Sequence, residues 1–217
     1  MPPNQWPEAK ELARLFVLMG EYMDQGHTYE ETYEHAVQNT QSELLRALFQ
    51  EMLTSAESRQ RAPDECMLKR PDLVPRWLYL IFLVGCTSGV PTVWVRGGKA
   101  HIKVGEDLLQ ASKSGQKATQ AQGKAFMLLF LTALNAGVII NLASSASAEW
   151  LGLAALEDFF PRVSKESEKS PAPIAAVCRQ HPNLFSPDLV RAIEEAESAS
   201  DPDLGLRSLA EKLMQEA

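Results

Sequence analysis

Apolar residues recur at helical spacing along most of the chain. Between residues 8 and 25 they stand at positions i, i+3, i+4 and i+7, as in an amphipathic helix, and Gly26 follows as a natural helix stop. Two capping-box patterns, at residues 28–31 and 40–43, predict the starts of a second and a third helix. Residues 77–84 are apolar almost all round, which predicts a central buried helix.

The same order of patterns recurs in the C-terminal half at a constant offset. The offset from Pro71 to Pro182 equals the offset from Gly26 to Gly137, since 182 − 71 and 137 − 26 are the same. The second set predicts helices over residues 126–136, 139–147, 149–163, 173–180, 187–197 and 202–215. A period close to half the chain is too long for a solenoid repeat and fits a duplicated small domain.

The first half departs from this order at residues 92–104. Apolar and polar residues alternate on both sides of Gly97 and Gly98, and a Gly-Gly pair is a favoured two-residue hairpin turn. A helix through both glycines would lose about 2 kcal/mol relative to alanine. We therefore predict a β-hairpin here, with a degenerate sixth helix as the alternative.

These patterns together predict an all-α protein of two tandem antiparallel helical bundles, each of about six helices. The first domain is expected at residues 8–91 and the second at residues 123–217. Residues 92–122 are expected to form the hairpin and a polar linker between them.

Composition and charge narrow the expected partners. The 217 residues are 45% apolar, enough for two modest cores, and the formal net charge is −7. This charge argues against the clustered basic face that nucleic-acid binding requires, so protein partners are expected. The three cysteines are odd in number and lack CxxC spacing, which indicates neither a disulfide framework nor a zinc site and fits a reducing cytosol: Cys66, Cys86 and Cys178.

Neither a signal peptide nor a membrane span is predicted. The N-terminus lacks a positive segment followed by an apolar one. The longest apolar run, residues 126–143, has about the minimum length for a span but contains Asn135, Gly137 and Asn141. We interpret this run as the first two helices of a bundle.

The residues with candidate chemistry have simpler structural explanations. His27, Glu31 and His35 stand at i, i+4 and i+8, the best metal-like spacing in the chain. Each step of four residues drifts about 40° around the helix, so three ligands on one ion would require a bend. A solvated face with helix-stabilising pairs is favoured. Cys86 is expected at a helix C-terminus, where the dipole disfavours a thiolate. No catalytic, cofactor or metal site is predicted.

The repeated pattern resembles the type II secretion system protein F domain. This domain is the cytoplasmic module of the inner-membrane platform protein in type II secretion and type IV pilus machines. The resemblance covers residues 12–89 and 126–214 and includes an apolar helix followed by a Gly-Glu-x-Ser/Thr-Gly motif. The first copy keeps three residues of the motif, Gly85, Ser88 and Gly89, but has Cys86 at the glutamate. The second copy keeps Glu197 but has Ala196 and Ser200 at the glycines.

The resemblance implies a non-enzymatic scaffold for protein assembly. Its interaction surface would comprise Gly85, Ser88 and Gly89 in one copy and Glu197 in the other. A secretion or pilus assembly ATPase is an expected partner, as are further copies of the chain. The expected location is the cytoplasm, including the periphery of the inner membrane, for a soluble paralogue without spans.

Two other functions remain open at this point. One is a ligand-sensing or regulatory helical module with a pocket between the two domains. The other is a metal-dependent enzyme that uses His27 and His35.

Overall fold

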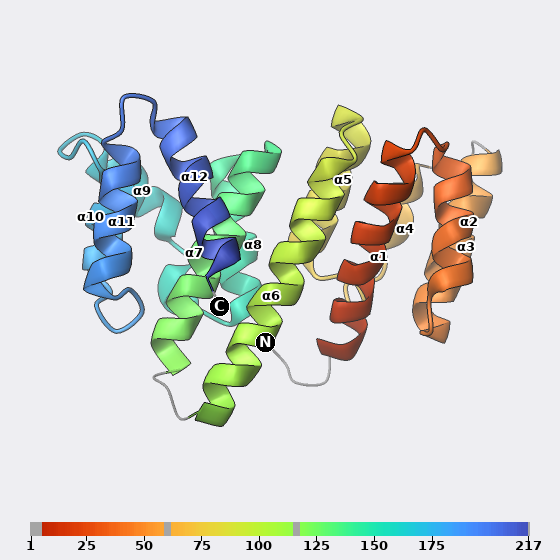
Figure 1. The fold of residues 1–217 in the computed structure, drawn as a ribbon, viewed down its shortest axis with the longest axis horizontal. Coiled ribbons are helices and arrows are strands. Elements are labelled where there is room, and N and C mark those ends of the chain that lie inside the picture. The colour runs from red at the N-terminus through yellow and green to blue at the C-terminus, as the bar shows by residue number, and fades with distance from the viewer. Residues whose placement is uncertain (1–5, 59–61, 115–117, 217) are drawn as a thin grey trace. The chain divides into compact units, whose positions relative to one another are not determined.

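The computed structural model describes residues 6–58, 62–114 and 118–216 (Figure 1). All regular secondary structure in these ranges is helical, so the predicted all-α class is confirmed. The chain divides into a first unit, Met1–Ile102, and a second unit, Lys103–Ala217.

The described part of the first unit contains five helices and the beginning of a sixth. They are α1 (Trp6–Asp24), α2 (Tyr29–Asn39), α3 (Glu43–Ser58), α4 (Pro63–Leu68), α5 (Arg76–Ser88) and the first part of α6 (Thr92–Ser114). The capping box predicted at Thr28 is confirmed, because Thr28 Oγ1 accepts from the Glu31 amide while the Glu31 carboxylate accepts from the Thr28 amide. The box predicted at residues 40–43 is wrong, because the side chain that caps this helix is not the one at residue 40. The Ser42 hydroxyl accepts from the Leu45 amide instead.

The apolar helix α5 supplies much of the core of the first unit, as its sequence predicts. Trp77, Leu78, Ile81 and Phe82 are fully buried. The Phe82 ring stacks on Trp94 with 5.3 Å between ring centroids, and the Trp94 indole Nε1 donates to the Phe82 carbonyl at 3.0 Å. This hydrogen bond satisfies the polar atom of a buried aromatic side chain.

The hairpin predicted at residues 92–104 is wrong, because this segment belongs to helix α6. A β-carbon placed on Gly97 would lie 2.4 Å from Ile81 Cγ2 of α5. One placed on Gly98 would lie 2.4 Å from the Ala13 carbonyl oxygen of α1. The glycines therefore allow close approach of α6 to two other helices, and this packing outweighs their poor helix propensity of about 2 kcal/mol.

The second unit continues from α6 through α7 (Ala118–Ala136) to six further elements in its described residues. They are α8 (Ile140–Leu151), the 3₁₀ turn η2 (Ala154–Leu156), α9 (Phe159–Glu166), α10 (Pro173–Arg179), α11 (Pro187–Glu197) and α12 (Pro202–Gln215). Its core includes a cluster in which Phe126 meets Phe159 edge-on at 5.0 Å and Phe130 meets Phe159 at 5.5 Å.

Three helices of the second unit differ from their predicted bounds: α7 begins at Ala118 and not at residue 126, α8 ends at Leu151 and not at residue 147, and the third differs most. The pattern over residues 149–163 predicts one helix, whereas α8 ends at Leu151 and α9 begins at Phe159. Gly152 ends α8 in the left-handed conformation, with φ of 66°, and its amide closes the last turn on Ala148 and Glu149. The break therefore follows from a glycine C-cap that the apolar pattern does not show.

Among the described helices, none has the length and apolar character that crossing a membrane requires.

Candidate functional site

The three predicted interaction residues of the first unit lie together at the end of α5, but they differ in exposure. Ser88 and Gly89 are exposed, and Gly89 adopts φ of 65° as its amide donates to the Gly85 carbonyl at 3.1 Å. Gly85 is buried, and a β-carbon there would lie 2.0 Å from Trp94 Nε1. Only Ser88 and Gly89 are therefore available to a partner, while Gly85 serves the packing of α5 against α6.

Glu197, the predicted interaction residue of the second unit, is buried at the end of α11. Its Oε1 accepts from the Ile174 amide and its Oε2 from the Ala175 amide, both at 2.8 Å. These amides belong to the first turn of α10, whose N-terminal N–H groups have no partner within the helix. Burial raises the pKa of the Glu197 carboxyl, and the two amides oppose this shift. The carboxylate thus holds the start of α10 in place.

Replacing this carboxylate is expected to destabilise the protein. Glu197→Ala leaves two buried amides without an acceptor, so we expect the free energy of unfolding to fall by about 2–4 kcal/mol. Urea unfolding followed by circular dichroism measures the loss. Glu195→Ala is the matched control, because Glu195 is exposed on the same helix and should cost less than about 0.5 kcal/mol. Equal effects of the two substitutions would refute the capping role.

Cys86, which stands where the motif of the resembled family has glutamate, is partly buried. Burial, and then the negative charge of Asp64, raise the pKa of its thiol to about 12. The thiol is therefore protonated at neutral pH and is a poor nucleophile or metal ligand. This agrees with the interpretation of Cys86 as a structural residue.

His27 and His35 do not converge on a metal site. The Tyr22 ring stacks on His27 with 3.7 Å between centroids and on His35 with 4.2 Å, both nearly parallel. Two rings stacked this closely on a third must occupy its opposite faces, so the imidazoles are separated by the tyrosine. Across the described ranges, no group of three histidine, cysteine or acidic side chains is placed to hold a metal ion.

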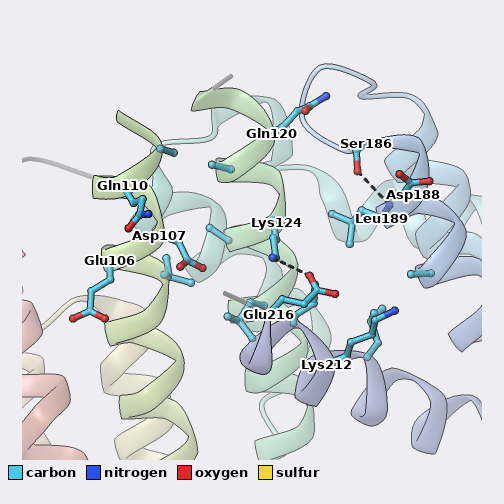
Figure 2. A pocket seen from close by; sticks show the side chains of 18 residues that line it. Glu106, Asp107, Gln110, Gln120, Lys124, Ser186, Asp188, Leu189, Lys212 and Glu216 are labelled. Atoms are coloured by element: carbon cyan, nitrogen blue, oxygen red, sulfur yellow. Dashed lines mark hydrogen bonds and ion pairs between the residues drawn. The ribbon is translucent and has the colours of Figure 1, made fainter. Parts of the chain in front are cut away.

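A groove that the sequence did not predict lies within the second unit (Figure 2). It has a volume of about 890 Å³ and is lined by residues of α6, α7, α11 and α12. Among the described residues that line it, those with charged side chains are Glu106, Asp107, Lys124, Asp188, Lys212 and Glu216. Its apolar residues include Val104, Leu128, Leu189, Leu209 and Leu213.

One ion pair and one hydrogen bond to a backbone carbonyl hold the residue that follows α12 at this groove. Lys124 Nζ of α7 lies 2.9 Å from Glu216 Oε2 (Figure 2). Lys103 Nζ of α6 donates to the Glu216 carbonyl and lies 3.1 Å from Asp107 Oδ2. Lys103 and Lys124 are thus both engaged with carboxylate or carbonyl oxygens of the protein itself.

Comparison of the chain with known protein families, with curated proteins and with solved structures finds no match. The resemblance to the F domain therefore stays a prediction from the residues quoted above. The structure leaves the predicted pair Ser88 and Gly89 exposed in the first unit and adds the groove in the second.

Proposed function

We propose that the chain is a non-enzymatic protein-interaction scaffold made of two duplicated helical bundles, related to the cytoplasmic module of the secretion and pilus platform protein. The observation that carries the proposal is the repeated order of helices. The offset from the start of α2 at Tyr29 to the start of α8 at Ile140 (140 − 29) recurs between the starts of α5 and α11 (187 − 76). Gly26 and Gly137 are separated by the same offset, and both have positive φ, 94° and 101°.

A contact between equivalent positions supports the duplication. In the first unit the pair is Gly85 and Trp94, and in the second it is Ala196 and Gly205, at the same offset along the chain. A β-carbon on Gly85 would meet Trp94, and one on Gly205 would lie 2.2 Å from the Ala196 carbonyl oxygen. The same two positions therefore approach closely in both units. Glycine stands at the first of them in the first unit and at the second of them in the second unit.

A second pair of equivalent positions also differs between the units, since the side chain with a carboxylate stands at a different member of the pair in each unit. Glu197 contacts the amide of Ala175 in the second unit, and the equivalent positions in the first unit are Cys86 and Asp64. The negative charge of Asp64 is one cause of the raised pKa of the Cys86 thiol, after burial. A glutamate at position 86 would face Asp64, and like charges repel. The charge of Asp64 therefore supports an uncharged residue at position 86 in the proposed first copy.

The interaction role follows from the resemblance and is tested at the exposed end of α5. Affinity capture of the tagged full chain from cells that naturally express it should recover a secretion or pilus assembly ATPase, or another identified protein in fixed proportion. Ser88→Arg adds a long charged side chain at an exposed position and should lower the recovery about tenfold.

The matched control is Ala47→Arg, at an exposed position on α3 of the same unit, which should leave recovery unchanged. Thermal unfolding must show that both variants are folded. Recovery of no protein, or recovery that Ser88→Arg leaves intact, would contradict an interaction surface at this end of α5.

A further inference from the structure

We propose that the turn between α10 and α11 is held to α9 by a pH-sensitive contact, which His181 makes only in its neutral form. The contact is a hydrogen bond between the side chains of His181 and Arg162. The inference goes beyond the scaffold role and does not depend on it, because the contact lies within the second unit and requires no partner protein.

The hydrogen bond determines the protonation state of His181. Arg162 of α9 directs its Nη1 to His181 Nε2 at 3.1 Å and its Nε to Asp158 Oδ2 at 2.8 Å. A guanidinium has only donors and stays charged in proteins, so His181 Nε2 must be the acceptor and the ring proton must lie on Nδ1. A proton on Nε2 would remove the acceptor and bring two positive charges together.

The surroundings of the ring favour its neutral form. Burial, and then the charge of Arg162, lower the pKa of His181 below its ordinary value of 6.5, while the charge of Asp158 opposes them. The charged side chains Arg179 of α10 and Glu194 of α11 form an ion pair with each other. Because the unfolded ring binds a proton more readily than the folded ring, the contact stabilises the turn at neutral pH and is lost as the pH falls through the folded pKa.

His181 also organises the turn through its backbone. Its carbonyl accepts from the amides of Leu184 and Phe185, both at 3.0 Å, and Phe185 is buried in the core of the unit. A second side-chain bond to α9 runs from Gln180 Nε2 to Glu166 Oε1, but at 3.5 Å it is long and weak. The bond to His181 is therefore the stronger of these two polar contacts between the turn and α9.

The same turn forms one wall of a cavity of about 370 Å³. Its other walls come from the start of α7 and from residues 152–155, which follow α8. Among the described lining residues, His181 is the one whose side chain can gain a charge near neutral pH. Protonation of His181 would therefore add a positive charge to this wall and release the turn from α9 in the same step.

The corresponding turn of the first unit has the same backbone bonds but a permanent charge. Arg70 and His181 each directly precede the proline of the repeated pattern. The Arg70 carbonyl accepts from the amides of Leu73 and Val74, at 3.0 and 2.8 Å. Arg70 keeps its charge across the range in which histidine titrates, so this turn is an internal control for the one that contains His181.

Nuclear magnetic resonance of the full chain tests the contact at the ring itself. The pKa of His181, read from its ring proton signals, should lie below 6.5 in the wild type. It should rise in Arg162→Met, which removes the charge and the donor. Lys165→Met is the matched control, because Lys165 is exposed on α9 and loss of its charge should shift the pKa less. A His181 pKa of 6.5 or above in the wild type, or equal shifts in the two variants, would overturn the proposal.

Hydrogen exchange of the turn amides tests the release of the turn. His181→Gln keeps an acceptor for the arginine and cannot be protonated. Between about pH 7.5 and about pH 5, the protection of the Leu184 and Phe185 amides should fall about threefold more in the wild type than in this variant, the effect of one lost hydrogen bond. The Leu73 and Val74 amides should change equally in the two proteins. An equal fall at Leu184 and Phe185 in both proteins would show that the turn does not respond to His181.

Discussion

Gly85→Ala is expected to lower the free energy of unfolding by about 3 kcal/mol, although it adds a single methyl group. The new β-carbon would lie 2.0 Å from Trp94 Nε1, well inside van der Waals contact. Trp94 cannot retreat easily, because it is 1% exposed, stacks on Phe82 and donates its indole N–H to the Phe82 carbonyl. The substitution therefore overpacks the core and strains a buried hydrogen bond. Urea unfolding followed by tryptophan fluorescence measures the loss.

A double substitution separates this clash from a general effect on α5. Gly85→Ala combined with Trp94→Leu should cost less than the sum of the two single changes, because the smaller side chain leaves room for the methyl group. Ser88→Ala, at an exposed position of the same helix, should cost less than about 0.5 kcal/mol. A cost below about 1 kcal/mol for Gly85→Ala, or strict additivity with Trp94→Leu, would show that the close contact does not constrain α5.

The stability of the protein is expected to fall as the pH decreases below 6.5, because His101 is buried in the neutral form. Its side chain is fully buried beside Trp77, and burial lowers its pKa to about 3. An unfolded histidine has a pKa near 6.5, so between pH 6.5 and about 3 the unfolded chain binds a proton that the folded chain does not. The free energy of unfolding should fall by about 2 kcal/mol from this residue between pH 6.5 and 5.

The contribution of His101 is obtained by difference from His101→Met. Methionine has no titrating group, and its side chain is apolar and of similar length to that of histidine. Urea unfolding of both proteins at several pH values cancels the contributions of all other titrating groups. Below pH 6.5 the wild type should lose stability more steeply than the variant, and parallel curves would show that His101 accepts a proton in the folded state.

Local sequence signals predicted much of the fold. Gly26 ends its helix with positive φ, and the Thr28 capping box opens the next one, because both depend on residues only a few positions apart. The hairpin prediction at residues 92–104 failed for the opposite reason. Close packing of Gly97 and Gly98 against residues of α5 and α1 is a tertiary contact, and no local pattern reports it.

The candidate sites also depend on contacts between segments that are distant in sequence, and local patterns do not report such contacts. The groove could not be predicted, because its lining combines residues of α6 and α7 with residues of α11 and α12, which lie far along the chain from them. The buried role of Glu197 did have a signal. Val190, Ile193 and Glu197 stand at i, i+3 and i+7, so the carboxylate falls on the apolar face of α11, where a charge requires buried partners. The amides that it contacts, in α10, could only come from the structure.

The central claim, that the chain is a protein-interaction scaffold, is tested most directly by the native mass of the complex that it forms in its own cells. The endogenously tagged chain, purified under gentle conditions, is analysed by native mass spectrometry together with its Ser88→Arg variant. The account predicts a discrete complex with an identified protein partner in whole-number stoichiometry, lost in the variant. A mass equal to the free chain, or to the chain with a bound metabolite, would contradict the account and favour a ligand-sensing module.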